Sequence, residues 1–156
     1  METLAKMKPA FKKEGGTVTA GNASGVNDGA AFMVLAAADV AAKAGQKPIA
    51  RLVSYAVAGV PNHIMGEGPI PATKIALQRA GLTLDKIDVI ESNEAFAAQA
   101  LAVTKGLGLD PAKTNVNGGA VALGHPVGCT GAAIATKAIY ELHRTGGKHA
   151  LVTMCI

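Results

Sequence analysis

One histidine in this sequence lies within a stretch whose composition suggests a binding loop. Residues 115–132 contain five glycines and one proline around His125. Such a density of glycine favours a backbone that turns tightly around a ligand and presents the imidazole to it. The alternative is an ordinary glycine-rich loop that carries a structural histidine.

Two further residues that can do chemistry follow predicted strands. Asn93 comes directly after one apolar run, and Cys155 lies near the end of the last one. A thiolate of suitable pKa can act as a base, and a neutral imidazole can supply a hydrogen-bond donor without a metal. Taken alone, however, Cys155 is also typical of a buried inert thiol and Asn93 of a helix cap. Spacing alone leaves these alternatives open.

The elements that must position these three residues alternate between strands and helices. Apolar patterns predict strands at 30–35, 49–57, 87–91 and 149–156, with a strand and loop at 115–124. Helical patterns that end at glycine predict helices at 36–44, 72–80, 95–105 and 129–145. This order predicts an α/β fold with helices on the faces of a layered sheet, in which sites gather where strands give way to helices.

Composition narrows the class of protein. The chain has 156 residues, of which 49% are apolar, with two cysteines, no tryptophan and a formal net charge of +4. The basic residues are scattered and not interleaved with aromatic residues, which argues against nucleic acid and fits a small anionic ligand. There is no apolar run long enough to span a membrane, and the cysteine content predicts a reducing cytoplasm. The four histidines lack paired ligand spacing, so we expect no metal.

Five segments of the sequence together resemble one enzyme family. They are GNASGVNDGAA (21–31), MGEGP (65–69), NEAF (93–96), GGAVALGHPVG (118–128) and MCI (154–156). In order and spacing they are similar to segments of the thiolases, and most similar to the acetyl-CoA acetyltransferases within that family. The resemblance implies a thiolase-like layered fold, a mixed sheet with helices on its faces. It also implies an acyltransferase that condenses two acetyl-CoA into acetoacetyl-CoA or runs the reverse thiolysis, with the coenzyme A thioester as substrate and no other cofactor.

The same resemblance implies roles for individual residues. His125 matches the histidine that activates a nucleophilic cysteine and helps to hold the thioester oxygen. Asn93 matches the asparagine that orients a water in the same oxyanion site, and Cys155 matches the acid/base cysteine. The expected substrate and CoA contacts are Ser24, Ala20, Met65 and Phe96.

The resemblance also implies what this sequence lacks. We expect residues 1–46 to match the end of the thiolase N-terminal half, and residues 47–156 to match the C-terminal domain without its final strand. Because no segment resembles the one that carries the nucleophilic cysteine, we expect a truncated chain that is inactive alone, from a parent that forms a homo-oligomer.

Two alternatives stay open at this stage. One is a non-catalytic CoA-binding or assembly module. The other is a different condensing enzyme of the same broad fold, such as a ketoacyl synthase, against which Asn93 argues, since that class places a second histidine there.

Overall fold

The computed structural model describes residues 2–156. Its elements, in chain order, are α1 (Glu2–Ala5), α2 (Ala38–Lys43), the 3₁₀ helix η1 (Asn62–Glu67), α3 (Pro69–Ala80), the 3₁₀ helix η2 (Leu84–Lys86), β1 (Val89–Ser92), α4 (Ala97–Leu107), α5 (Ala120–Leu123), α6 (Val127–Thr145) and β2 (Ala150–Thr153). The predicted α/β class is confirmed.

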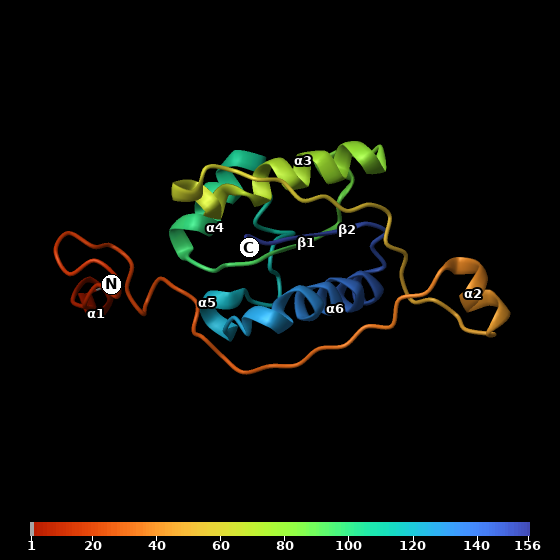
Figure 1. Ribbon diagram of the computed structural model, residues 1–156, viewed down its shortest axis with the longest axis horizontal. Coiled ribbons are helices and arrows are strands. Elements are labelled where there is room, and N and C mark those ends of the chain that lie inside the picture. The colour runs from red at the N-terminus through yellow and green to blue at the C-terminus, as the bar shows by residue number, and fades with distance from the viewer. Residues whose placement is uncertain (1) are drawn as a thin grey trace.

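The body of the molecule has three layers. β1 and β2 pair in parallel, with Val89 opposite Ala150 and Ser92 opposite Thr153. Helices α3 and α4 lie on one side of these strands and α6 lies on the other (Figure 1). The buried apolar core consists of Ile87, Ile90, Val103, Leu109 and Leu151. This sandwich holds the carboxyl ends of both strands at one edge.

The helices follow the predicted glycine signals, with one correction. Gly81 ends α3 at φ +64° and Gly146 ends α6 at φ +72°, as expected for left-handed C-caps. Gly106 was expected to end α4, but the helix continues to Leu107 and Gly108 takes the left-handed conformation at φ +70°. Gly106 instead faces Ile70 of α3, whose side chain would meet a Cβ at 2.5 Å. Its small size therefore serves helix packing.

Three predicted strands are wrong. Residues 30–35 and 49–57 run extended without a strand partner, and 115–124 forms turns followed by the short helix α5. In the second segment Ser54 Oγ donates to Ala76 O at 2.7 Å, and Arg79 Nη1 donates to Tyr55 O at 2.7 Å. These side-chain bonds lay the segment along α3 in place of a backbone ladder. The regular sheet of residues 2–156 is accordingly a parallel pair, smaller than the mixed sheet expected.

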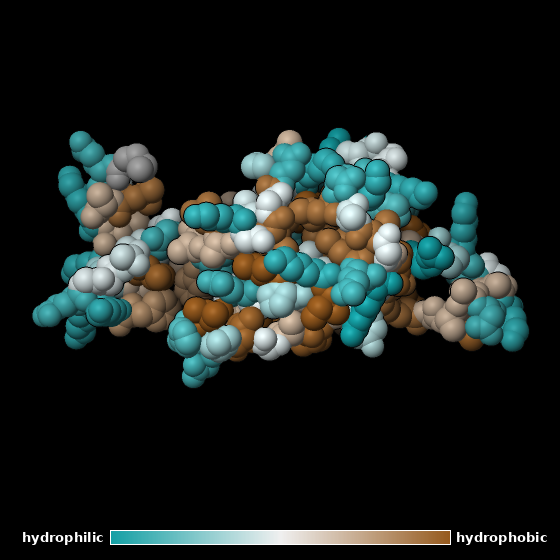
Figure 2. All heavy atoms as spheres, turned by 90° about the horizontal axis from the view of Figure 1, so that it is seen from above, coloured by the Kyte–Doolittle hydropathy of each residue, from teal (hydrophilic) through white to brown (hydrophobic). Residues whose placement is uncertain are grey.

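The molecule exposes much surface for its mass. Helices α1 and α2 lie at opposite ends of its longest axis, with the layered body between them (Figure 1). The accessible surface is 10423 Å², against about 7,250 Å² for a compact monomer of this mass. Phe32 and Val34 are 92% and 99% exposed. Apolar side chains also show between polar ones over the α3–α4 side (Figure 2). Among residues 2–156, none of the helices is long and apolar enough to cross a membrane.

Candidate active site

Two predicted site residues follow the paired strands at the same edge. The backbone N–H of Asn93 donates to Thr153 O at 3.0 Å, which continues the β1–β2 ladder by one step. Asn93 is 3% exposed. The N-cap of α4 is Phe96, so the alternative that Asn93 caps this helix is wrong. Cys155 follows β2 by two residues.

The loop that leads to His125 is attached to the end of β1. Asn115 has a φ of +49° and forms a two-way amide pair with Ser92. Its Oδ1 accepts from Ser92 N at 2.9 Å, while its Nδ2 donates to Ser92 O at 2.8 Å. Asparagine tolerates the left-handed conformation better than most residues. This pair anchors the chain just before the glycines.

Glu94 binds the same loop through its carboxylate. Its carboxylate accepts from Val121 N at 3.1 Å and from Asn115 Nδ2 at 3.3 Å. A Cβ on Gly119 would lie inside this carboxyl group, so only glycine fits there. Glu94 therefore has a structural role in this loop.

A buried ion pair holds the other side of the loop. Lys137 Nζ lies 2.9 Å from Glu91 Oε2 and donates to Gly118 O at 2.7 Å. The Glu91 side chain is 2% exposed, and burial raises the pKa of its carboxyl in spite of the bond from Lys137. Residues 115–121 are therefore bonded to β1, to its C-terminal end and to α6.

His125 itself is held at three points. Asn93 Nδ2 lies 3.4 Å from the Nε2 atom, and Thr130 Oγ1 lies 2.7 Å from the Nδ1 atom. The backbone N–H of His125 donates to Gly25 O at 2.9 Å, beside a parallel bridge between Val26 and His125. The structure thus brings Asn93 and His125 into contact and orients the imidazole.

Thr130 is a site residue that the sequence interpretation missed. It is 3% exposed and lies in the first turn of α6. A hydroxyl residue shortly after the histidine, inside a helix predicted to begin there, was the available signal.

Cys155 joins this edge of the sheet as a half-buried thiol. Burial raises the pKa of the thiol, an effect that the bond from its own backbone N–H opposes. The thiol is consequently protonated at neutral pH, and the thiolate that it yields is a stronger base than a solvated one.

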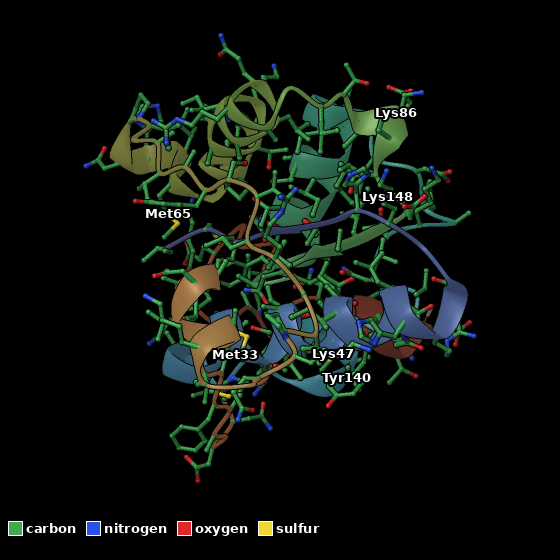
Figure 3. The ribbon with its side chains drawn as sticks, turned by 90° about the vertical axis from the view of Figure 1, so that its right-hand side faces the viewer. Met33, Lys47, Met65, Lys86, Tyr140 and Lys148 are labelled. Carbon is green, nitrogen blue, oxygen red and sulfur yellow. The ribbon has the colours of Figure 1, made fainter. Side chains whose placement is uncertain are left out.

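The expected substrate contacts are distributed over several segments. Ser24 donates to Ala95 O from its backbone N–H at 3.0 Å and from its hydroxyl at 3.1 Å. The neighbouring Phe96 packs edge-on against Phe11 with ring centroids 6.1 Å apart. Met65 lies on η1 at the α3–α4 side of the sheet and is 49% exposed (Figure 3). Ala20 is an exposed turn residue. Ser24 and Phe96 are thus brought together.

Two other residues that could do chemistry are Cys129 and His63. Cys129 lines an open cavity of about 290 Å³ between residues 27–32 and 126–129. His63 lies in η1 and is exposed. Over residues 2–156, no group of three or more His, Cys, Asp or Glu side chains is placed to hold a metal ion.

Comparison with known proteins extends over the whole chain. The family model for the thiolase C-terminal domain matches residues 46–156, and that for the thiolase N-terminal domain matches residues 1–39. The beta-ketothiolase BktB of Cupriavidus necator is 62% identical over 156 residues, which are 100% of this chain and 40% of that protein.

Solved structures agree with this match. The crystal structure of the Bacillus anthracis acetyl-CoA acetyltransferase superposes with a TM-score of 0.93 at 52% identity, covering 99% of this chain and 39% of that one. Human mitochondrial 3-ketoacyl-CoA thiolase in complex with CoA gives a TM-score of 0.88 at 49% identity, with the same two coverages. The chain spans about 40% of the length of the curated relatives that it matches.

Proposed function

The chain belongs to the thiolase family, and from that premise we propose that it supplies the histidine, asparagine and acid/base cysteine of an acetyl-CoA C-acetyltransferase. The proposed reaction joins two acetyl-CoA units into acetoacetyl-CoA, or cleaves acetoacetyl-CoA with CoA in reverse. The observation that carries the proposal is the 3.4 Å contact between Asn93 Nδ2 and His125 Nε2 at the carboxyl edge of the sheet.

The proposed roles follow from the acidity of the substrate. The α-proton of a thioester is weakly acidic, so its removal needs a base and fixed hydrogen-bond donors for the enolate oxygen. Cys155 would be that base, since burial makes its thiolate more basic. His125, in its imidazolium form, and Asn93, through a water, would provide donors to the oxygen.

The substrate assignment rests on the segment that carries Ser24. The bonds from Ser24 to Ala95 O hold this segment across the start of α4, next to Phe96. One solved relative is titled as a complex with CoA, which supports CoA as the ligand. We place the pantetheine arm near Ser24 and Ala20, and the acyl group near Met65 and Phe96. A cytoplasmic location is part of the same proposal and fits the free thiols of Cys129 and Cys155, which suit a reducing compartment. A homo-oligomeric parent is proposed from the family resemblance alone.

A chimera tests the proposal. In the Bacillus anthracis acetyl-CoA acetyltransferase, the matching 39% would be replaced by this chain. We expect the chimera to cleave acetoacetyl-CoA, and His125→Ala to lower kcat by about 10²–10³-fold, the usual loss for one oxyanion donor. His63→Ala, at an exposed position, is the matched control and should leave kcat unchanged. A folded chimera that His125→Ala leaves fully active would overturn the proposal.

A second candidate is a CoA-binding module without turnover. It is favoured because neither Cys129 nor Cys155 matches the acyl-accepting cysteine that the family resemblance implies. The 156-residue chain alone should then show no thiolysis of acetoacetyl-CoA, and calorimetric titration with CoA should show binding. Absence of heat of binding from a folded chain would rule this candidate out.

A further inference from the structure

The hydroxyl of Thr130 lies between two groups that it can bond. Its Oγ1 is 2.7 Å from His125 Nδ1 and 3.0 Å from Pro126 O. The second contact is the bond to the i−4 carbonyl that helical threonines often make. A hydroxyl has one proton, so it can donate to only one of the two groups.

Two arrangements of protons are possible around the neutral imidazole. If Thr130 donates to Pro126 O, it accepts from His125 Nδ1–H, and the Nε2 lone pair of His125 accepts from the amide of Asn93. All three close contacts are then hydrogen bonds. If Thr130 donates to Nδ1 instead, its oxygen lies 3.0 Å from Pro126 O with no proton between them, although Pro126 O keeps the backbone N–H groups of Cys129 and Thr130 as donors. In that arrangement Nε2–H also points at the Asn93 Nδ2 donor 3.4 Å away.

The first arrangement leaves no buried polar contact unmatched, and unmatched contacts are costly away from water. We therefore infer that Thr130 is a positioning residue, which holds neutral His125 with its proton on Nδ1 and its lone pair on Nε2. The exposure of Thr130 is 3%, so water does not compete for its hydroxyl.

His125 has two expected roles, as a base toward a thiol and as a hydrogen-bond donor to a thioester oxygen. The assigned tautomer determines which role comes first, and this step rests on the proposed function. The Nε2 lone pair accepts a proton from a thiol, which leaves a thiolate and an imidazolium. Only then does Nε2 carry a proton that it can donate to a thioester oxygen. The imidazole thus acts first as a base and afterwards as a donor.

The inference is tested by determining the tautomer of His125, a measurement that does not depend on enzymatic activity. The chain is labelled with ¹⁵N-histidine, and long-range ¹H–¹⁵N NMR spectra are recorded at a pH where the imidazole is neutral. His125→Gln identifies the signals among the four histidines. We expect a protonated Nδ1 and an unprotonated Nε2. A protonated Nε2 in the wild-type chain overturns the inference.

Two variants separate positioning from packing. Thr130→Ser keeps the hydroxyl and should keep the tautomer, whereas Thr130→Val keeps the shape and should shift the signals toward Nε2–H. In the chimera, Thr130→Val should lower kcat about 10²-fold, the lower range for loss of general base catalysis, and leave KM nearly unchanged. A folded Thr130→Val chain that retains Nδ1–H overturns the inference. If that variant does not fold, the wild-type and Thr130→Ser spectra decide, and neither depends on whether the chimera is active.

Discussion

Replacing Lys137 by methionine would leave the buried carboxylate of Glu91 without its counter-ion. Methionine keeps most of the apolar stem of the lysine but removes the ammonium that binds Glu91 Oε2 and Gly118 O. The Oε1 atom of Glu91 is already buried without a hydrogen-bond partner. Because its side chain is only 2% exposed, water cannot replace the lost charge.

The size of the expected loss in stability is limited because Glu91 can become protonated. From an ordinary carboxyl pKa of 4.5, protonation at pH 7 costs about 3.4 kcal/mol, at 1.36 kcal/mol per pKa unit. The unpaired carboxylate can cost no more than this before it is neutralised. The carbonyl of Gly118 loses its donor as well, which adds about 1 kcal/mol. We expect Lys137→Met to lower the free energy of unfolding by about 3–4 kcal/mol at pH 7.

The loss should depend on pH with a definite sign. The pKa of Glu91 is raised in the folded state, so the stability that this group contributes is complete below the unfolded pKa and falls as the pH rises through the folded one. Removing Lys137 raises the folded pKa further. The destabilisation should therefore shrink to about 1 kcal/mol near pH 4, where only the Gly118 bond is missing.

The free energy of unfolding at each pH is measured by urea unfolding. Far-UV circular dichroism follows the transition, because the chain has no tryptophan whose fluorescence could report it. Lys148→Met, at an exposed lysine, is the matched control and should change the free energy little. Adding Glu91→Gln to Lys137→Met should remove the pH-dependent part. A Lys137→Met variant that loses less than about 1 kcal/mol at both pH values would refute the reasoning.

Three further perturbations follow from the site. Gly119→Ala would place a methyl group in the Glu94 carboxylate and should lower the free energy of unfolding in urea by about 1–3 kcal/mol. Gly128→Ala, the control with open space around it, should be neutral or stabilising. Equal effects of the two substitutions would contradict this prediction. The pKa of Glu141 is lowered to about 2 by the bonds from Arg144 and Asn117. The stability that Glu141 contributes is therefore complete above its unfolded pKa of 4.5 and lost as the pH falls toward 2. Glu141→Gln should make the free energy of unfolding depend less on pH in this acidic range. Cys155 should react with iodoacetamide at higher pH than free cysteine, by mass spectrometry of its peptide, because burial raises its thiol pKa; a profile like that of free cysteine would be the contrary result.

The parts of the fold that sequence predicts well are those decided locally. Glycine after α3 and after α6 acts through backbone conformation within one turn, and these predicted ends are confirmed, whereas α3 begins at Pro69, before the predicted start at residue 72. Gly106 shows the limit of such signals. A glycine in a helix can also be required by a neighbouring helix, here through Ile70, and sequence alone does not distinguish the two uses.

Strands are harder to predict because a strand needs a partner. In residues 49–57 the burial alternates only from residue 53 on, and in the opposite phase to the apolar pattern, since Ser54 and Ala56 are partly covered whereas Val53 and Tyr55 are exposed. The segment bonds to α3 and not to a neighbouring strand. The alternating pattern reports an extended backbone but not the ladder that makes it a strand.

The candidate site was predicted in part for a similar reason. Glycine density marked the loop of His125, and the parallel strands account for its meeting with Asn93. The supporting groups Thr130, Asn115 and Lys137 are ordinary polar residues in the sequence. Their importance arises from burial and from the atoms that they contact, which only the structure provides.

The large surface of the folded chain also affects how it unfolds. The extended chain would expose about 22,600 Å², so reaching 10423 Å² removes about 12,200 Å², roughly a fifth less than compact folding would remove. Both the denaturant m-value and the heat-capacity change of unfolding scale with that area. This protein should therefore unfold with a broader urea transition, and with a flatter dependence of stability on temperature, than is usual for 156 residues.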